Sequence, residues 1–573
     1  MDCPSIQLAS LVTREPIGLG FNREKGRSLR FLWSCKLRKA SEAGKSLNIK
    51  NRSKLHLKRF SKELKRFFRS SMKKMNVLLV FAVLALSLNS VAQNLSDQLN
   101  TISNDNDMMG GSVVVFCQNG IIENLFIGKS DLDRDINITE NTKYRMASIS
   151  KTITAIAIMQ LVEQNLLDLD ENISSILGYT VQNPNNPAVA ITTRMLLSHT
   201  SSIVDGSTYS NFIGATVNNN PIPNLSEILT VGGDYYSSGQ FNNTEPGTYF
   251  NYSNINYVIL GTILEKVSNA RFDIYIKENI SIPLGIDASF NVNDITDIDQ
   301  VAVLYRKING VWTPQAEDYQ GIQPVFDNLS GYIPGTNGGR FGPQGGFRCS
   351  AQDLAKIFLV LANGGSFDNV TLLAPTSRDA MFANEWTYNG NNGNNYSGLF
   401  RSWGLGIHRI TSTPGNDIAL PGSASMFGHP GEAYGLVSDA YYDPIRKVGL
   451  VFMTNGVGGG YQTDNNSIFY TVEQEIFNAI ENYGNIDDCL LNASINELEL
   501  EDKAIYPNPS SDFINITECS TQEGCLVTIM TADGRIVRSI RFEKGTTTID
   551  IKDLSKGMYI LDIDGVNYSF IRE

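Results

Sequence analysis

Hydrophobic and polar positions alternate with two different periods along the middle of the chain, and each period predicts a different element. Short apolar runs predict buried strands at 111–117 (GSVVVFC) and 448–453 (VGLVFM). Apolar residues at helical spacing predict four longer helices, at 149–162, 257–267, 353–361 and 467–480. Because strands lie at both ends with helices between them, we expect an α+β unit whose terminal strands share one sheet.

Two long stretches inside this unit, 204–245 and 290–345, are rich in Asn, Gly, Pro and aromatic residues. We interpret them as surface excursions that rim a pocket, because connections of this length are most often functional. The unit as a whole is assigned to residues 93–485. The acidic stretch 486–502 has no firm period and is interpreted as a linker.

Residues 503–573 change to short alternating runs, separated in two places by Asp-Gly hairpin signals. Strands are expected at 513–517, 526–530, 536–542, 547–551, 558–563 and 568–571. The pattern predicts a small all-β sandwich near the lower size limit for an independent core. Cys519 and Cys525 lie close enough in sequence to form a disulfide in an exported protein, and two unpaired thiols are an equal alternative.

The chain carries a secretory signal that begins far from residue 1. Residues 72–92 combine two lysines, the apolar run VLLVFAVLALSL and a small-residue cleavage site after Ala92. The apolar run is too short to span a bilayer comfortably, so no transmembrane helix is expected in the mature protein. A signal acts at a nascent N-terminus, so we interpret 1–71 as upstream sequence absent from the mature protein. The alternative is a basic nucleic-acid-binding arm.

The overall charge of −12 over 573 residues hides this division. Residues 1–71 hold 18 Lys/Arg and 5 Asp/Glu, whereas residues 93–573 carry a net charge of −27. An acidic body repels phosphates, which argues against a nucleic-acid partner. Four histidines and seven cysteines without CxxC spacing predict no metal site, and no cofactor is expected.

Three short motifs could carry chemistry together. Ser148 opens a predicted helix and Lys151 follows one turn later, so a serine hydroxyl and an amine share one face. Tyr252 and Asn254 stand at the mouth of another predicted helix, in the sequence YSN. His429 belongs to a glycine-flanked turn, GHPG, that leads into a strand. Each motif alone is weak, because SxxK and YxN recur elsewhere in the chain.

In this order and with their flanking sequences, the three motifs resemble the serine β-lactamase and penicillin-recognising hydrolase superfamily. The similarity is greatest to class C β-lactamases, D-alanyl-D-alanine carboxypeptidases and β-lactamase-like esterases. It covers about residues 100–485 and implies an α+β fold in which helices flank an antiparallel sheet. Further stretches match family segments at 167–171 (LDLDE), 192–202 (TTRMLLSHTSS), 283–286 (PLGI) and 345–348 (GGFR).

The resemblance implies a role for each motif residue. Ser148 would attack a carbonyl and form an acyl-enzyme, while Lys151 and Tyr252 would share the proton transfers, with either as the general base. The remaining residues would bind or support the substrate. These are Asn254, which would hydrogen-bond Lys151, His429 beside Tyr252, Gly431, and Glu432, whose backbone N–H would complete an oxyanion hole with that of Ser148.

One position departs from the family pattern. The middle residue of the third motif is often threonine in the family, whereas here it is Pro430, which has no hydroxyl and no backbone N–H. His429 also supplies a less certain positive charge than lysine. Both changes weaken binding of a substrate carboxylate, so we expect an ester or a small amide or peptide substrate. The alternatives are a β-lactamase or D-Ala-D-Ala carboxypeptidase, a binding protein with the same fold, and an adhesin built from the β-tail.

Other reactive side chains receive structural interpretations. His199, within the family-like HTSS segment, is expected to be structural, and His408 is expected to be a strand residue near the pocket. Cys349 has no histidine nearby in sequence and is interpreted as a packing residue.

The tail has a resemblance of its own. YPNP at 506–509 and the ending LSKGMYILDI at 554–563 resemble the type A C-terminal sorting domain of the type IX secretion system of Bacteroidetes. This implies an interaction with the type IX machinery through residues 503–573. The protein would be exported through the periplasm and become secreted or attached to the cell surface. The alternative is an ordinary β-sandwich adhesion or carbohydrate-binding module.

Overall fold

The computed structural model divides into two units, and the described residues belong to the larger of them, Ser90–Glu573. The described residues are 95–326, 329–463, 466–483, 486, 489, 505–506, 512–516, 525–531, 536–542, 547–563 and 566–572. The predicted signal peptide and the basic segment before it therefore lie outside the described residues. No helix within the described ranges is long and apolar enough to cross a membrane.

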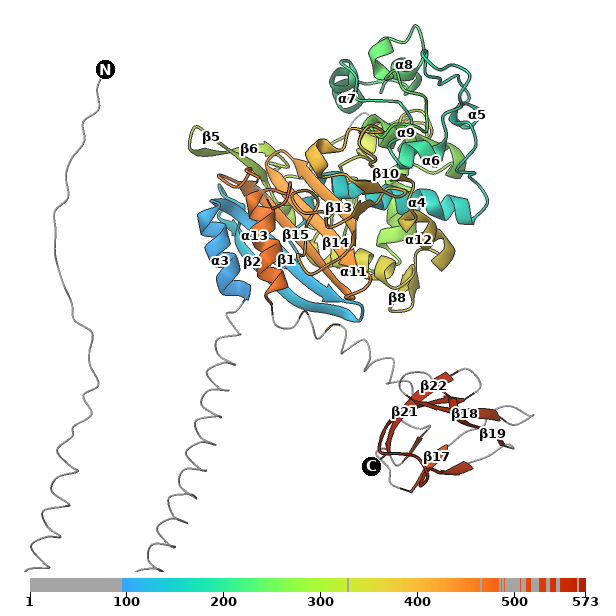
Figure 1. Cartoon of the computed structure of the whole chain (residues 1–573). Coiled ribbons are helices and arrows are strands. Elements are labelled where there is room, and N and C mark those ends of the chain that lie inside the picture. Colours follow the sequence, from blue (N-terminus) through green and yellow to red (C-terminus); the bar gives the residue numbers. More distant parts are fainter. Residues whose placement is uncertain are drawn as a thin grey trace, which may run out of the picture. The chain divides into compact units, whose positions relative to one another are not determined.

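A nine-stranded sheet forms the centre of the larger unit (Figure 1), in the order β10-β11-β12-β13-β14-β15-β1-β2-β3. In chain order the strands are β1 (Met108–Cys117), β2 (Gly120–Asp131), β3 (Ile136–Asn137), β10 (Trp386–Thr387), β11 (Ser402–Trp403), β12 (His408–Ile410), β13 (Met426–Ala433), β14 (Leu436–Asp443) and β15 (Val448–Val457). β1 pairs antiparallel with β15, with Val113 opposite Phe452. The prediction that the first and last strands share one sheet is therefore confirmed.

Helices cover both faces of this sheet. The helices of this unit, several of which pack on α9 away from the sheet, are α3 (Leu95–Asp105), α4 (Ser150–Glu163), α5 (Ile173–Leu177), α6 (Thr193–Leu197), α7 (Tyr209–Asn218), α8 (Ser226–Leu229), α9 (Ile255–Ser268), α10 (Phe272–Ile276), α11 (Ala351–Ala362), α12 (Pro375–Phe382) and α13 (Thr471–Glu481). Val114 of β1 belongs to the core shared with α4, α9 and α11. Its neighbours Val113 and Val115 point the other way, into the core shared with α3 and α13. β1 is therefore apolar on both sides, which explains its continuous hydrophobic run.

The closing helix begins later than its periodicity predicts. The predicted range was 467–480, but α13 begins at Thr471. The hydroxyl of Ser467 donates to the backbone carbonyls of Asn416 and Ile418, which keeps this residue in a loop contact. Glu473 then accepts a hydrogen bond from the backbone N–H of Tyr470 at the start of the helix.

A disulfide that was not predicted joins the ends of the hydrolase-like unit. Cys117 at the end of β1 bonds Cys489, which lies 372 positions later in sequence, with a Cα–Cα distance of 5.2 Å. The bridge suggested from the sequence, Cys519–Cys525, is not tested, because Cys519 lies outside the described residues. Spacing could not reveal the observed pair, because the sheet brings the two cysteines together only after folding.

The tail forms an all-β unit, as predicted. Its strands are β16 (Ile505–Tyr506), β17 (Phe513–Ile516), β18 (Cys525–Thr531), β19 (Ile536–Phe542), β20 (Thr547–Asp550), β21 (Gly557–Ile563) and β22 (Val566–Arg572). They make a three-stranded sheet, β16-β17-β20, and a four-stranded sheet, β19-β18-β21-β22. Ile514, Val527 and Leu561 belong to one small buried core. Both Asp-Gly turn dipeptides lie outside the described residues.

The two excursions contain regular structure of their own. Stretch 204–245 holds α7 and α8, and stretch 290–345 holds a hairpin of β5 (Leu304–Ile308) and β6 (Val311–Ala316). The remaining short strands pair as β4 (Tyr144–Arg145) with β7 (Arg348–Cys349) and β8 (Ser366–Phe367) with β9 (Val370–Thr371).

Candidate active site

Ser148 lies in a tight turn that leads into α4. A 3-10 segment, Ala147–Ile149, precedes the α-helix, so the predicted helix start holds to within two residues. Ala147 adopts a left-handed conformation with φ of 51°, which an alanine tolerates only when its surroundings impose it. The backbone N–H of Met146 donates to the carbonyl of Phe347, which helps to hold the turn in place.

Lys151 is fully buried and donates to three oxygens. Its Nζ lies 3.1 Å from Ser148 Oγ, 2.9 Å from Asn254 Oδ1 and 2.8 Å from the carbonyl oxygen of Gln344. Burial lowers the pKa of the Lys151 ammonium to about 7, although the charge of Asp205 acts in the opposite direction. An amine that shares its proton readily near neutral pH therefore lies against a serine hydroxyl.

Tyr252 and Asn254 stand at the N-terminus of α9, where the sequence analysis placed them. The Tyr252 hydroxyl is buried, and burial raises its pKa well above the ordinary value despite an opposing contribution from Ser148. Lys151 Nζ lies 4.8 Å from the centre of the Tyr252 ring. The tyrosine therefore remains protonated at a pH at which Lys151 loses its proton.

Asp205 supports this arrangement, although it belongs to none of the three sequence motifs. Its carboxylate accepts from Asn254 Nδ2 at 2.8 Å and from the backbone N–H of Ile255 at 2.8 Å. It therefore caps α9 and fixes the amide whose oxygen accepts from Lys151. The two partners lie about 50 positions apart in sequence, so no local pattern could have linked them.

β13 brings the third motif to the same place. The His429 ring lies 6.0 Å from the Tyr252 ring, and its Nδ1 is 2.6 Å from the Pro430 carbonyl oxygen. Burial first, and then Lys151, hold the pKa of His429 well below its usual range, so the ring is neutral. A methyl group on Gly431 would lie 3.3 Å from the backbone nitrogen of Ser148, which shows how closely this strand approaches the serine. The carboxylate of Glu432 accepts from the Tyr470 hydroxyl at 2.8 Å.

Two family models match the chain, and they identify the families of its two parts. The model of the β-lactamase family matches residues 90–472. The chain belongs to the β-lactamase family. A second model, of the secretion-system C-terminal sorting domain, matches residues 504–573 of this β-lactamase-family protein. The sorting tail shows that the protein is exported, to be secreted or held at the cell surface, with the involvement of type IX secretion.

Individual relatives match parts of the chain. Protein flp of Staphylococcus aureus strain MRSA252 is 28% identical over 186 residues, 32% of this chain and 35% of its own length. Penicillin-binding protein 4* of Bacillus subtilis is 28% identical over 177 residues, 31% of this chain and 37% of its own. The matched segment thus spans about a third of these relatives. The octameric penicillin-binding protein homologue from Pyrococcus abyssi shares the fold, with 19% identity, a TM-score of 0.50, and coverage of 83% of this chain and 99% of its own.

The other reactive side chains of this β-lactamase-family protein lie in packed surroundings. His199 accepts from the backbone N–H of Ser253 at 3.1 Å and packs 4.3 Å from the Tyr252 ring. His408 lies on β12, where its Nδ1 is 2.9 Å from the hydroxyl of Tyr441. Cys349 is a free, buried thiol whose pKa is raised well above the usual value by burial.

A cleft of about 1260 Å³ opens over Ser148. Its walls include α7 from the first excursion, Gln344 and Gly345 from the second, and the β13–β14 edge. Aromatic side chains form much of the rim, namely Tyr209, Tyr252, Tyr396, Phe400, Tyr434, Phe469 and Tyr470. Within the described part of the chain, no group of three His, Cys, Asp or Glu side chains could hold a metal ion.

Proposed function

We propose that the protein is an exported serine hydrolase that cleaves an ester or a small amide or peptide through an acyl-enzyme at Ser148. One observation carries the proposal. The buried Lys151 amine, whose pKa is about 7, lies 3.1 Å from Ser148 Oγ. A nucleophile and a base in hydrogen-bond contact are the arrangement that covalent catalysis by serine requires.

The two pKa shifts suggest how the proton transfers are divided. Neutral Lys151 takes the proton of Ser148 as Oγ attacks the substrate carbonyl. Tyr252, which is still protonated, gives its proton to the leaving oxygen or nitrogen and regains one from Lys151. A water molecule then attacks the acyl-enzyme by the same route in reverse, releasing the acid and restoring Ser148.

The negative charge that develops on the carbonyl oxygen also needs donors. We assign these to the backbone N–H groups of Ser148 and Glu432. The close approach of Gly431 to the Ser148 backbone supports the assignment, because it brings β13 beside the turn that carries the nucleophile. The Glu432 side chain has Tyr470 and Arg306 as partners, so only the backbone of this residue is given a role.

The third motif suggests which substrates are favoured. A β-lactam or a D-Ala-D-Ala terminus presents a carboxylate, which a lysine and a threonine in this motif would help to bind. Here the buried His429 is neutral, and Pro430 offers neither a hydroxyl nor an N–H group. We therefore place the β-lactamase and carboxypeptidase activities second.

Ser148→Ala tests the proposal directly. The wild-type protein should hydrolyse p-nitrophenyl acetate faster than nitrocefin, and a fluorophosphonate probe should label Ser148. The variant should lose both turnover and labelling while keeping its melting temperature. A folded wild-type protein that is neither labelled nor active would instead indicate a binding protein with this fold.

The assignments at the two chain ends can be tested during export. We propose that the mature protein lacks residues 1–71 and the signal 72–92, so its intact mass should correspond to a start at Gln93. Deleting 503–573 should trap the protein in the periplasm. Secretion of the deletion variant would refute the sorting role of this tail.

A further inference from the structure

A second cavity, of about 300 Å³, adjoins the cleft over Ser148. Arg145, Ile213, Val217 and Gln344 line both spaces, so these four residues form a shared wall. Gln344 is also the residue whose carbonyl accepts from Lys151 at 2.8 Å. A substrate that is held at Ser148 therefore has a second chamber next to it. We refer to this chamber as the side pocket.

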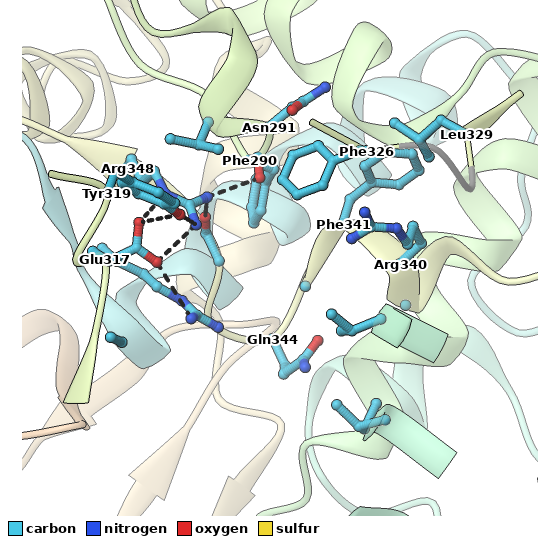
Figure 2. A pocket seen from close by; sticks show the side chains of 18 residues that line it. Phe290, Asn291, Glu317, Tyr319, Phe326, Leu329, Arg340, Phe341, Gln344 and Arg348 are labelled. Carbon is cyan, nitrogen blue, oxygen red and sulfur yellow. Dashed lines mark hydrogen bonds and ion pairs between the residues drawn. The ribbon is translucent and has the colours of Figure 1, made fainter. Parts of the chain in front are cut away.

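Aromatic and aliphatic side chains form much of the side pocket. Phe326, Leu329 and Phe341 lie together on one side of it, and Phe290 lies beside them, nearer to Arg348 (Figure 2). The Phe290 ring packs 4.9 Å from the Phe347 ring. Apolar walls of this kind favour a flat apolar group over water, and a dry cavity of about 150 Å³ already holds a benzene ring.

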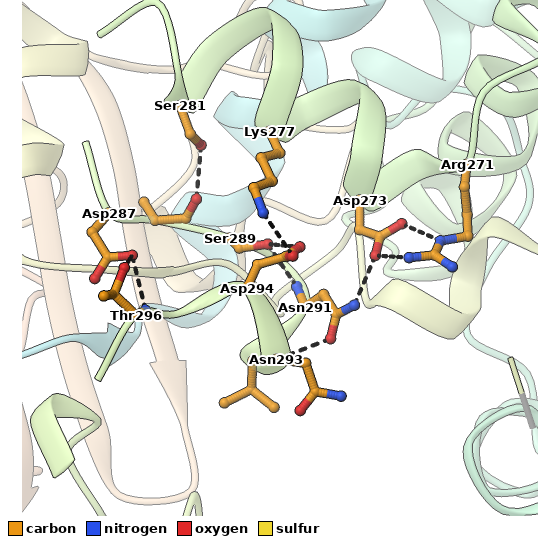
Figure 3. A network of polar contacts seen from close by, with 12 residues as sticks. Arg271, Asp273, Lys277, Ser281, Asp287, Ser289, Asn291, Asn293, Asp294 and Thr296 are labelled. Atoms are coloured by element: carbon orange, nitrogen blue, oxygen red, sulfur yellow. Dashed lines mark hydrogen bonds and ion pairs between the residues drawn. The ribbon is translucent and has the colours of Figure 1, made fainter. Parts of the chain in front are cut away.

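The wall that carries Phe290 and Asn291 is fixed by polar contacts (Figure 3). Asn291 Nδ2 donates to Asp273 at 2.9 Å, and Asp273 accepts from Arg271 at 2.7 Å. Ser289 Oγ accepts from the Asn291 backbone N–H and donates to Asp294. This network holds in place the wall of the side pocket that carries Phe290 and Asn291.

Among the described residues, the charged side chains that line the side pocket are mostly positive. Arg348 binds Glu317 through two nitrogens, at 2.5 and 2.8 Å, and Arg145 approaches the same carboxylate at 3.4 Å. Arg340 lies across the cavity from this cluster (Figure 2), over the ring of Phe326. The lining thus holds three arginines and one glutamate. An anionic group on the ligand is favoured here, and a cationic group is disfavoured.

The position of the side pocket indicates which half of the substrate it receives. In the proposed mechanism the leaving group takes a proton from Tyr252, so it must lie beside that hydroxyl. Tyr252, Tyr396 and Phe400 line the main cleft but not the side pocket. The acyl group, which remains on Ser148, therefore points toward the shared wall at Arg145 and Gln344.

We propose that the side pocket selects the acyl group of the substrate, and that the preferred acyl group is aromatic with a carboxylate at its far end. The inference rests on the proposed hydrolase function. It is compatible with the weak carboxylate recognition at His429 and Pro430, because the carboxylate proposed here belongs to the acyl group in the side pocket.

The test compares p-nitrophenyl esters that share one leaving group. The acyl groups are acetyl, phenylacetyl, 4-(carboxymethyl)phenylacetyl and 4-(aminomethyl)phenylacetyl, and the purified full-length chain is assayed for kcat/KM. Phenylacetyl should exceed acetyl by at least about tenfold, since a matched apolar group in a pocket is worth 10- to 200-fold. The carboxylated ester should exceed the aminomethyl ester by at least about tenfold.

Variants of the side pocket then test whether this cavity causes the preference for the phenylacetyl ester. Ala316→Phe and Leu329→Trp fill the side pocket, and each should reduce the phenylacetyl-to-acetyl ratio to within about twofold of one while acetyl turnover persists. If one variant fails to fold, the other still tests the inference. Val311→Phe, on the same β5–β6 hairpin but 64% exposed and outside both cavities, is the matched control. Arg340→Gln should reduce the discrimination between the carboxylated and aminomethyl esters.

Three failures of the test are distinguishable. Turnover of acetate with no aromatic preference, or an aromatic preference that survives both filling variants, would overturn the side-pocket inference alone. An aromatic preference without preference for the carboxylate would overturn the charge assignment. Absence of turnover of all four esters by folded protein would overturn the proposed hydrolase function, and the side-pocket inference with it.

Discussion

Asp205 offers the sharpest test of the electrostatics at Lys151. Its carboxylate is connected to the amine through Asn254, by one hydrogen bond of 2.8 Å and another of 2.9 Å. Asp205 stabilises the charged form of Lys151 and so raises its pKa, against the larger effect of burial. Replacing the carboxylate by an amide in Asp205→Asn removes that charge. The Lys151 pKa should therefore fall below about 7.

The expected size of this pKa shift follows from the distance between the Asp205 carboxylate and the Lys151 amine. The two hydrogen bonds and the intervening amide separate the charges by about 7 Å, and with an effective dielectric constant of about 20 to 80 Coulomb's law gives about 0.6 to 2.4 kcal/mol. Asp205 is solvent-exposed, so screening favours the lower half of this range. A shift of about half to one pKa unit is expected, since one unit corresponds to about 1.4 kcal/mol.

The assay is the pH dependence of kcat/KM with p-nitrophenyl acetate. In the proposed mechanism Lys151 acts as a neutral base, so activity should rise through its pKa as the pH increases. Asp205→Asn should move this acid limb to lower pH by about half to one unit. Asp234→Asn, an exposed aspartate on the same excursion that lines neither cavity, should leave the limb in place.

Asp205→Asn should also change the stability of the protein, and this effect has to be separated from the shift of the Lys151 pKa. Asp205 also caps α9, so its substitution should lower the free energy of unfolding by about 1 kcal/mol, which a melting curve would record. A loss of stability alone cannot move a pH limb. An acid limb that stays in place in folded Asp205→Asn, or that moves to higher pH, would refute the assignment of Lys151 as the base.

Three further variants test other parts of the structure. Gly431→Ala would place a methyl group 2.4 Å from Ser438 Oγ and 2.7 Å from the Met146 carbonyl oxygen, so kcat/KM should fall by about 10²- to 10³-fold, whereas Gly239→Ala, in open surroundings, should have little effect. Replacing both Cys117 and Cys489 by alanine should cost about 2–4 kcal/mol in urea unfolding, and an unchanged midpoint would argue against the bridge. Arg348→Met would leave Glu317 buried with weaker partners, so unfolding should become easier by about 3–5 kcal/mol, and a smaller change would mean that Arg145 alone compensates the charge.

The sequence predicts the fold well where periodicity is continuous. β1 and β15 read as apolar runs because both of their faces are buried, and α4, α9 and α11 appear within a few residues of their expected bounds. The same logic fails at 467–470, where the residues are apolar enough for a helix. There the Ser467 hydroxyl bonds two carbonyls that lie about 50 positions earlier in the chain, and periodicity contains no information about such contacts.

The residues of the candidate site differ in the same way: local pairs can be predicted from the sequence, and long-range contacts cannot. Ser148 with Lys151, and Tyr252 with Asn254, can be found because each pair is local in sequence. The three-residue spacing also places Ser148 and Lys151 on one face. Asp205, the shared wall at Gln344 and the Cys117–Cys489 bridge join segments far apart in sequence. These long-range contacts also set the chemistry, because the burial and the charge that act on the Lys151 amine come from segments outside its own helix. A sequence motif can therefore identify a candidate base. The pKa of that base, however, depends on contacts that only the folded structure shows.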